Sequence, residues 1–300
     1  PQPKNKMSLK KAAVSFEYPN YRKWFIGQTA SLIGTWMQST AQGVLVYELT
    51  GSAAYLGIVA FAAGAPAWLF TLFGGVVSDR MSRRTLLVIT QISMMILAFF
   101  LAAIVYAGVV LPWHVVVLAF LLGIANAFDA PARIAFVTEL VDRPALSNAI
   151  ALNSTMFTLA SIVGPAVAGL AYAAFGAAWC FTINAVSYLA VIIALLAMQL
   201  PKFIKPEKKV SAIHTLREGL SYTRRHPSIR ILLFVIAFSS LLGIGFLTLI
   251  PAWAVEVLSG GPTINGLLQS ARGIGSLITA FSIAALGSIH YKGRLLTFGS

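Results

Sequence analysis

Long apolar runs separated by short polar intervals dominate this chain of 300 residues. A bilayer core about 30 Å thick needs roughly 20 residues of helix, because each residue adds about 1.5 Å. The runs predict eight membrane-spanning helices, near residues 22–47, 55–77, 85–107, 113–136, 148–174, 178–198, 230–252 and 263–287. The first run is too long for a signal-peptide h-region and lacks a small-residue cleavage site, so we predict a spanning helix there.

The polar intervals alternate in charge along the chain. Those after the first, third, fifth and seventh runs contain neither Lys nor Arg, whereas every basic residue except Arg272 lies in the other intervals or within a few residues of them. Loops rich in Lys and Arg remain on the cytoplasmic side of a membrane. We therefore expect both ends of this chain to be cytoplasmic.

Composition agrees with a membrane protein and argues against a nucleic-acid partner. Hydrophobic residues make up 58% of the chain and charged residues 10%, whereas soluble domains carry about 25% charge. The net charge of +13 would suit nucleic acid only if the basic residues formed one face of a soluble body. They lie instead between apolar runs, so we expect a lipid bilayer around a monomer. The single cysteine, Cys180, excludes an internal disulfide framework.

The longest polar interval follows the sixth run. Apolar and basic residues recur there at helical spacing, which predicts a helix lying at an anionic membrane surface. A solvated linker helix is the alternative. The residues that carry this pattern are Ile213, Leu216, Arg217, Leu220, Arg224 and Arg225.

The chain repeats itself weakly at an offset of 209 residues, without gaps. Matching residues fall in matching runs: Gly57 with Gly266, Gly64 with Gly273, Ser31 with Ser240, Gly34 with Gly243, and Arg83 with Lys292. Two parallel six-helix halves are a known transporter architecture. We therefore predict an N-terminal six-helix bundle over 1–198, a basic cytoplasmic linker over 199–229, and the start of a second bundle over 230–300. That architecture would place about four more helices beyond the last residues, LLTFGS.

Two motifs resemble signatures of the major facilitator superfamily. The interval after the second run, GGVVSDRMSRR, has the spacing G-x-x-x-D-R-x-x-R-R of its loop 2–3 signature, with Gly75, Asp79, Arg80, Arg83 and Arg84. The fifth run contains SIVGPAVAGL, which resembles the antiporter signature at Gly164, Pro165 and Gly169. The segments NAFDAPARIAFVTELV and LREGLSYTRRHP are similar to the drug:proton antiporter branch that includes enterobactin-exporter-like transmembrane secretion effectors.

The resemblance implies an all-α integral membrane fold with twelve helices, alternating access, proton-driven export and a place in the bacterial inner membrane. In the second copy of the loop signature, Ser288 stands where the first copy has Asp79. This departure does little to weaken the resemblance, because the second copy of the signature is often degraded in that superfamily.

The loop signature also has a physical interpretation. Gly75 would allow close approach to a neighbouring helix, and Asp79 can accept hydrogen bonds at a helix end in one state and release them in the other. Such a contact would act as a latch; the alternative is that Arg80, Arg83 and Arg84 only anchor the positive side. Gly164 and Pro165 predict a kink, whether for function or for packing alone.

Polar residues form a stripe on the first predicted span. They are spaced three or four residues apart, so they share one helix face. Exposure to lipid would be costly, and we predict that they line a central aqueous cavity; contact between helices is the alternative. The stripe consists of Gln28, Ser31, Thr35, Gln38 and Gln42, and the eighth span repeats it with Asn265, Gln269 and Arg272.

Charged residues inside the spans are few. Arg272 lies about 14 Å into the eighth span, where it would bind an anionic substrate group or balance a titrating acid, unless it reaches the surface instead. Asp129 and Arg133 lie four residues apart, about 24 Å into the fourth span. That depth favours a gate network with the Asp79 loop, although Asp129 could also carry the coupling proton. Glu48 and Glu256 are expected in solvent near the outer surface.

Enzyme motifs are absent from the sequence. It contains no H-E-x-x-H, P-loop or G-x-S-x-G pattern, and its four histidines are scattered. We therefore expect no catalytic residues, metal or cofactor. The combined prediction is a proton-driven exporter of small drug-like or siderophore-like molecules. An importer of a polar metabolite and a membrane-embedded enzyme or sensor are the alternatives.

Overall fold

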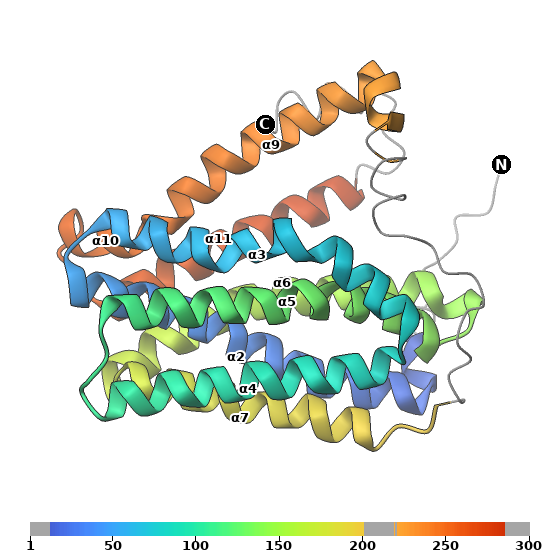
Figure 1. Cartoon of the computed structure of the whole chain (residues 1–300), viewed down its shortest axis with the longest axis horizontal. Helices are drawn as coiled ribbons and strands as arrows, with labels where there is room; N and C mark the ends of the chain where they lie inside the picture. The colour runs from blue at the N-terminus through green and yellow to red at the C-terminus, as the bar shows by residue number, and fades with distance from the viewer. Residues whose placement is uncertain (1–12, 201–218, 220, 286–300) are drawn as a thin grey trace.

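Helices account for the regular structure of the described part of the chain. The fold is taken from a computed structural model that describes residues 13–200, 219 and 221–285, and every regular element there is helical (Figure 1). The prediction of an all-α protein is therefore confirmed. The elements are η1 (Val14–Glu17), α2 (Pro19–Thr50), α3 (Ala53–Arg80), α4 (Arg83–Tyr106), α5 (Pro112–Leu140), α6 (Arg143–Phe175), α7 (Ala177–Leu196), α9 (Pro227–Thr248), α10 (Ile250–Glu256) and α11 (Pro262–Ala285).

Six of the described helices are long and apolar enough to cross a membrane by length and composition: α3, α4, α5, α6, α7 and α9. Eight spans were predicted. The other two, α2 and α11, have 32 and 24 residues and are long enough. They are less apolar because they carry the two polar stripes, whose side chains must find partners inside the protein.

Short connections between helices follow from their terminal residues. Proline stands in the first turn of α2, α5, α6 and α11, where its missing N–H removes no helical hydrogen bond. Gly51 ends α2 with a φ of 57°, and Gly176 joins α6 to α7 with a φ of 84°. Both conformations favour glycine. Neighbouring helices along the chain therefore reverse direction within a few residues.

The core is organised around α2, which packs on α6 and α7, while α3 packs on α5 and α4 packs on both α5 and α7. Two buried apolar clusters occupy opposite ends of the bundle, one around Val46 and Phe181 and the other around Trp24 and Phe136. The cavity described below, which includes Ser31 and Met94, lies between these clusters. It is therefore away from both ends of the bundle.

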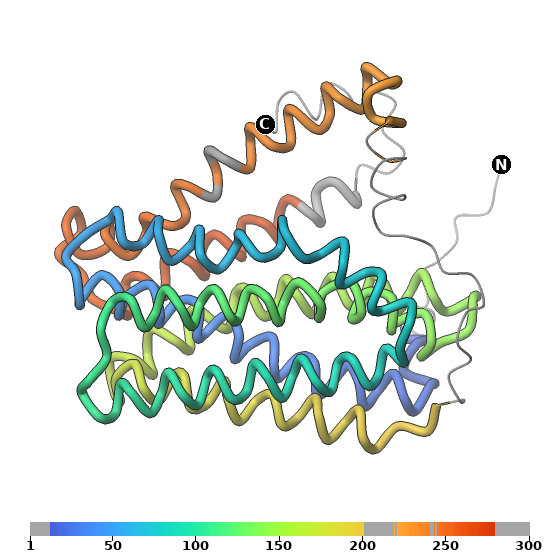
Figure 2. The backbone as a smooth tube through the Cα atoms, viewed as in Figure 1, coloured from blue at the N-terminus to red at the C-terminus, as the bar shows by residue number. Residues whose placement is uncertain are grey.

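The seventh predicted span, 230–252, is interrupted in the structure. The helix α9 ends at Thr248, and the short α10 begins at Ile250. Pro251 explains the break, because it cannot donate a hydrogen bond to Leu247 and its ring would clash with the preceding turn. Figure 2 shows α9 leaving the bundle at an angle, and its most apolar stretch is not buried.

Parts of two predictions lie outside the described residues. Most of the predicted surface helix falls in 201–218, although residues 221–225 are helical. The second copy of the loop signature, with Ser288 and Lys292, falls in 286–300.

Candidate functional site

A cavity of about 250 Å³ lies among α2, α4, α5, α6 and α7. Six of its thirteen lining residues come from α2, and α5 contributes the charged ones. The lining residues are Gln28, Ser31, Leu32, Thr35, Trp36, Ser39, Gln91, Met94, Asn126, Asp129, Arg133, Phe157 and Tyr188. The lining thus combines polar and charged side chains with apolar and aromatic ones.

The polar stripe of α2 divides between two environments. Gln28, Ser31 and Thr35 line the cavity, and the Thr35 hydroxyl donates to the Ser31 carbonyl oxygen at 2.9 Å. Gln38 does not line the cavity: its Oε1 accepts a hydrogen bond from Asn184 Nδ2 on α7 at 2.6 Å. Gln42 is half-buried and also lies outside the lining. The half of the stripe nearer Gln28 is therefore the part that faces the cavity.

Close approach of α7 explains the position of Gln38. A Cβ at Gly34 would lie 2.6 Å from Asn184 Oδ1 and 3.1 Å from its Cα, so only glycine allows this separation. With α7 this close, the Asn184 amide reaches Gln38 in the interior. Sequence spacing alone does not reveal this partner, because it depends on how α7 is rotated.

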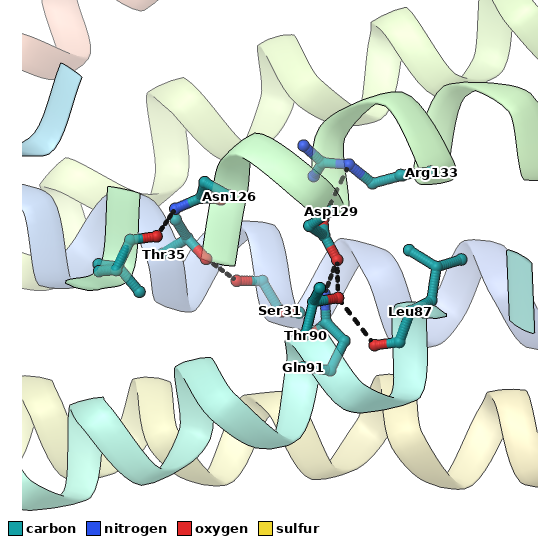
Figure 3. Close-up of polar contacts among 9 residues, drawn as sticks. Ser31, Thr35, Leu87, Thr90, Gln91, Asn126, Asp129 and Arg133 are labelled. Carbon is teal, nitrogen blue, oxygen red and sulfur yellow. Dashed lines mark hydrogen bonds and ion pairs between the residues drawn. The ribbon is translucent and has the colours of Figure 1, made fainter. Parts of the chain in front are cut away.

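Asp129 is the central charged residue of the cavity. Its side chain is 2% exposed, and Figure 3 shows it between Arg133 on the same helix and two α4 residues. Oδ1 accepts from the Thr90 hydroxyl at 2.8 Å and from Gln91 Nε2 at 3.0 Å, while Oδ2 lies 3.6 Å from Arg133 Nε. The structure therefore places Asp129 in the cavity wall rather than with the exposed Asp79.

Sequence reasoning missed Thr90 and Gln91. The signal was a pair of adjacent polar residues in an otherwise apolar stretch, LLVITQI. A threonine inside a membrane helix is usually bonded to its own backbone, so the pair did not indicate a partner on another helix.

Two buried amide oxygens at the cavity have no hydrogen-bond partner within the described residues. They are Gln28 Oε1 and Gln91 Oε1, on side chains that are 1% and 2% exposed. Buried polar atoms are normally paired, so each of these acceptors needs a donor that the described residues do not supply. The cavity can accordingly accept hydrogen bonds in addition to carrying charge.

The stripe on α11 contacts α2 from outside the cavity. Gln269 Oε1 accepts from the Thr40 hydroxyl, and its Nε2 donates to Asn265 Oδ1, both at 3.4 Å. The Arg272 guanidinium carbon lies 5.5 Å from the centre of the Trp36 ring, which is within range of a cation–π contact. Trp36 lines the cavity, so Arg272 lies behind that wall.

The arginines of the α3–α4 connection are bonded to other helix ends. Arg83 Nη1 lies 2.9 Å from Glu139 and 3.2 Å from the Ala135 carbonyl oxygen on α5. Arg84 donates to the carbonyl oxygens of Leu196 and Met198 at the end of α7, at 2.9 and 3.3 Å. The Leu196 carbonyl belongs to the last turn of α7, where it has no partner within the helix, so Arg84 stabilises that helix end.

The expected close approach at Gly75 is wrong by one residue. A Cβ at Gly75 would meet open space, whereas a Cβ at Gly74 would collide with the Ala127 carbonyl oxygen of α5. The reason is helix rotation: adjacent residues point about 100° apart, and Gly74 is the one that faces α5. Asp79 and Arg80 are exposed at the end of α3.

The antiporter-like motif lies where α6 meets two other helices. A Cβ at Gly164 would crowd Trp36 on α2, and one at Gly169 would lie 2.9 Å from the Pro262 carbonyl oxygen on α11. Pro165 lies inside the continuous α6, with its carbonyl oxygen against Gly266. The motif thus places α6 in close contact with both α2 and α11.

Two tyrosine–glutamate hydrogen bonds join helices at the end of α2. The Tyr47 hydroxyl donates to Glu256 on α10, and the Tyr172 hydroxyl on α6 donates to Glu48. Both glutamates are exposed, as expected, but each is bonded to a buried tyrosine. Within the described residues, no three His, Cys, Asp or Glu side chains are grouped as a metal site would require.

A family model described as a transmembrane secretion effector matches residues 12–300. The staphyloferrin A transporter of Staphylococcus aureus (strain NCTC 8325 / PS 47) is 26% identical over 258 residues, covering 85% of this chain and 65% of that protein. Macrolide efflux protein A of Streptococcus pyogenes is 24% identical over 290 residues, covering 93% and 70%. Enterobactin exporter EntS of Escherichia coli O9:H4 (strain HS) is 26% identical over 282 residues, covering 91% and 63%. The chain thus spans about two thirds of the length of these relatives.

A solved structure supports the same fold. It is a bacterial homologue of the human lysosomal transporter Spinster, in an inward-facing and unoccupied conformation. It matches with a TM-score of 0.68 at 14% identity, over 96% of this chain and 64% of that chain. Together with the family model, which covers almost the whole chain, this establishes that the protein belongs to the transmembrane secretion effector family of the major facilitator superfamily.

Proposed function

We propose that this protein exports small molecules across the cytoplasmic membrane and is driven by the proton gradient. The observation that carries the proposal is the pair of buried Asp129 and half-buried Arg133 in the wall of a cavity, within a bundle of apolar helices. An ionisable pair at such a site is costly to bury and usually serves transport or proton transfer. The names of the relatives, two of them exporters or efflux proteins, support the direction.

In this proposal Asp129 takes up and releases the coupling proton. A carboxylate that loses its charge also loses its attraction to Arg133, so the guanidinium becomes available to a substrate or to water in the cavity. Gln28 and Gln91, with their unpaired oxygens, would accept hydrogen bonds from a bound substrate. Arg272, behind Trp36, would add positive charge close to the aromatic wall.

We further propose that the protein works by alternating access, with a cytoplasmic N-terminus. On this proposal α2–α7 form one half, and α9–α11 begin the second half. The seam of α6 with α11 and the bond between Tyr47 and Glu256 would close one end of the passage. The basic α3–α4 connection would then lie on the cytoplasmic side.

Proteoliposomes with an imposed pH gradient and an internal pH dye test this proposal. The panel would contain staphyloferrin A, enterobactin, a macrolide and amphipathic dyes. We expect proton flux linked to at least one compound, loss of that flux in Asp129→Asn, and retention in Asp142→Asn, a matched change at an exposed acid. Absence of substrate-linked proton flux for the whole panel would contradict proton-driven export.

A further inference from the structure

We propose that Thr90 is a positioning residue that lets Asp129 take up and release its proton without rearrangement of the helices. This role rests on the proposed function of Asp129. The Thr90 oxygen lies 2.8 Å from Asp129 Oδ1 and 3.0 Å from the Leu87 carbonyl oxygen (Figure 3). A hydroxyl has one proton to donate and two lone pairs to accept with. Thr90 therefore donates to one of these two acceptors at a time.

The two choices correspond to the two charge states of Asp129. When the carboxylate is ionised, Thr90 donates to Oδ1, because hydrogen bonds to charged acceptors are the stronger ones. When Oδ1 carries a proton, that O–H donates to the Thr90 oxygen, and the Thr90 proton turns to the Leu87 carbonyl. In each state both Oδ1 and the Thr90 hydroxyl are hydrogen-bonded, and the change needs only rotation of one hydroxyl.

The geometry also indicates which oxygen takes the proton. Oδ2 lies 3.6 Å from Arg133 Nε, which can donate a hydrogen bond but cannot accept one, whereas the Thr90 hydroxyl beside Oδ1 can accept. A hydronium ion from the cavity would transfer one proton to Oδ1, forming one O–H bond and leaving one water molecule. Gln91 Nε2 stays within 3.0 Å of Oδ1 and can donate to its remaining lone pair.

The surroundings of Thr90 leave it no other polar partner among the described residues. It is 5% exposed, and its far side lines an apolar groove bounded by α3, α4 and α5, with neighbours such as Ile124 and Phe128. Its methyl group suits this groove and its hydroxyl faces Asp129. A threonine bonded only to its own helix would make the Leu87 contact without the second one.

Few other titratable groups lie near Asp129 whose protonation could be mistaken for that of its carboxyl group. Arg133 on α5 and Tyr188 on α7 line the same cavity, while α2 and α4 contribute amides, hydroxyls and apolar groups, and α6 contributes Phe157. The helix α3, which packs on α5, carries its charged residues Asp79 and Arg80 at its exposed end. A pH response of the Asp129 carboxyl is therefore separable from other groups by substitution.

The test is infrared difference spectroscopy of the liposome-reconstituted protein during a pH titration, with no substrate present. The carbonyl band of the protonated carboxyl is assigned by its loss in Asp129→Asn. We expect Thr90→Val and Thr90→Ala to raise the titration midpoint by about one pH unit, since the ionised form loses a charge-assisted hydrogen bond. The expected midpoint of Thr90→Ser, which keeps the hydroxyl, is that of the unmodified protein.

Thr182→Val is the matched control. Among the described residues, the Thr182 hydroxyl bonds only to the Ala178 carbonyl oxygen of its own helix, so its loss should not affect the midpoint. An unchanged midpoint in both hydroxyl-free variants, or an equal shift in Thr90→Ser, would overturn the role of Thr90. If the midpoint shifts in the hydroxyl-free variants but the protein shows no substrate-linked proton flux, the proposed transport is contradicted and the role of Thr90 stands. If the flux is present but its pH profile is unchanged in Thr90→Val, the role of Thr90 is contradicted and the proposed transport stands.

Discussion

Asp129 presents its two carboxylate oxygens to different neighbours, with neutral donors on one side and a cation on the other. At the scale of single residues, the sequence drew attention to Asp129 and Arg133, and the structure brings both side chains to the cavity. Within the polar stripe of α2, some side chains face the cavity and others face another helix. Gln28 and Gln38 are ten residues apart on the same helix and have different surroundings.

Replacing Asn184 with Ala should lower the stability of the protein. Gln38 Oε1 would lose its partner in the interior, which costs about 1–3 kcal/mol of unfolding free energy. Thermal unfolding of the purified protein in detergent would measure this change. Gln42→Ala, at a half-buried position of the same stripe, is the control and should change stability less; equal losses would contradict a specific role for the Gln38–Asn184 bond.

Replacing Arg272 with Ala should weaken substrate binding and the contact of α11 with α2. A cation–π contact of this kind contributes roughly 0.5–2 kcal/mol, depending on how far it is desolvated. Trp36 fluorescence in single-tryptophan variants would report the lost contact, and a compound active in the flux assay would report binding. If both signals are unchanged, Arg272 has no part in the cavity.

At the scale of helices, contacts depend on which residue of a pair faces the neighbour. The α3–α4 connection illustrates this, because its arginines bond to the ends of α5 and α7 while Asp79 is exposed. A latch at Asp79 therefore requires a partner in another state of the transporter. Two substitutions probe these contacts separately.

Gly74→Ala and Gly75→Ala form a matched pair at the end of α3. The added methyl at Gly74 would collide with the Ala127 carbonyl oxygen, and overpacking of this kind costs typically about 1–3 kcal/mol. The same methyl at Gly75 meets open space and should be neutral or slightly stabilising, because alanine favours helix. Thermal unfolding of the two variants measures the difference, and a larger loss in Gly75→Ala would contradict the packing described.

Asp79→Asn should slow transport while leaving membrane insertion and protein abundance unchanged. The exposed carboxylate makes no hydrogen bond in the described part of this structure, so its loss should not destabilise this state. Initial rates in proteoliposomes, normalised to the amount of reconstituted protein, provide the measurement. Transport at the unmodified rate would exclude the latch.

At the scale of the whole molecule, two tyrosine–glutamate bonds have different roles in the proposed mechanism. Tyr47 reaches from α2 to Glu256 on α10, which would cross between the two proposed halves. Tyr172 reaches from α6 to Glu48 on α2, which lies within the first half. A rocking motion would therefore break the first bond and keep the second.

Tyr47→Phe should reduce the population of the state that contains the Tyr47–Glu256 bond, relative to the state in which this bond is broken. The expected change in the ratio of the two states is about tenfold, corresponding to ~1.4 kcal/mol for one hydrogen bond to a carboxylate. Tyr172→Phe should lower stability without changing that balance. Distances between spin labels on α2 and α10, measured by pulsed electron resonance, would report the populations. Equal effects of the two substitutions on these populations would contradict the division into halves.

The sequence by itself determined the helices and their approximate ends. A membrane-spanning segment must satisfy its backbone within its own helix, so length, apolar character, proline and glycine are enough to predict it. The exception, the break at Leu249, also had a local cause in Pro251. The polar stripes of α2 and α11 could also be predicted, because the spacing of polar residues along one helix is a local property of the sequence.

Only the tertiary structure decided which polar groups meet. The bonds of Asp129 with Thr90 and Gln91, of Gln38 with Asn184, and the close approach at Gly74 each join residues from different helices. Such pairs depend on the rotation and depth of each helix against its neighbours. Those are set by the packing of side chains far apart in the chain, which no local pattern in the sequence encodes.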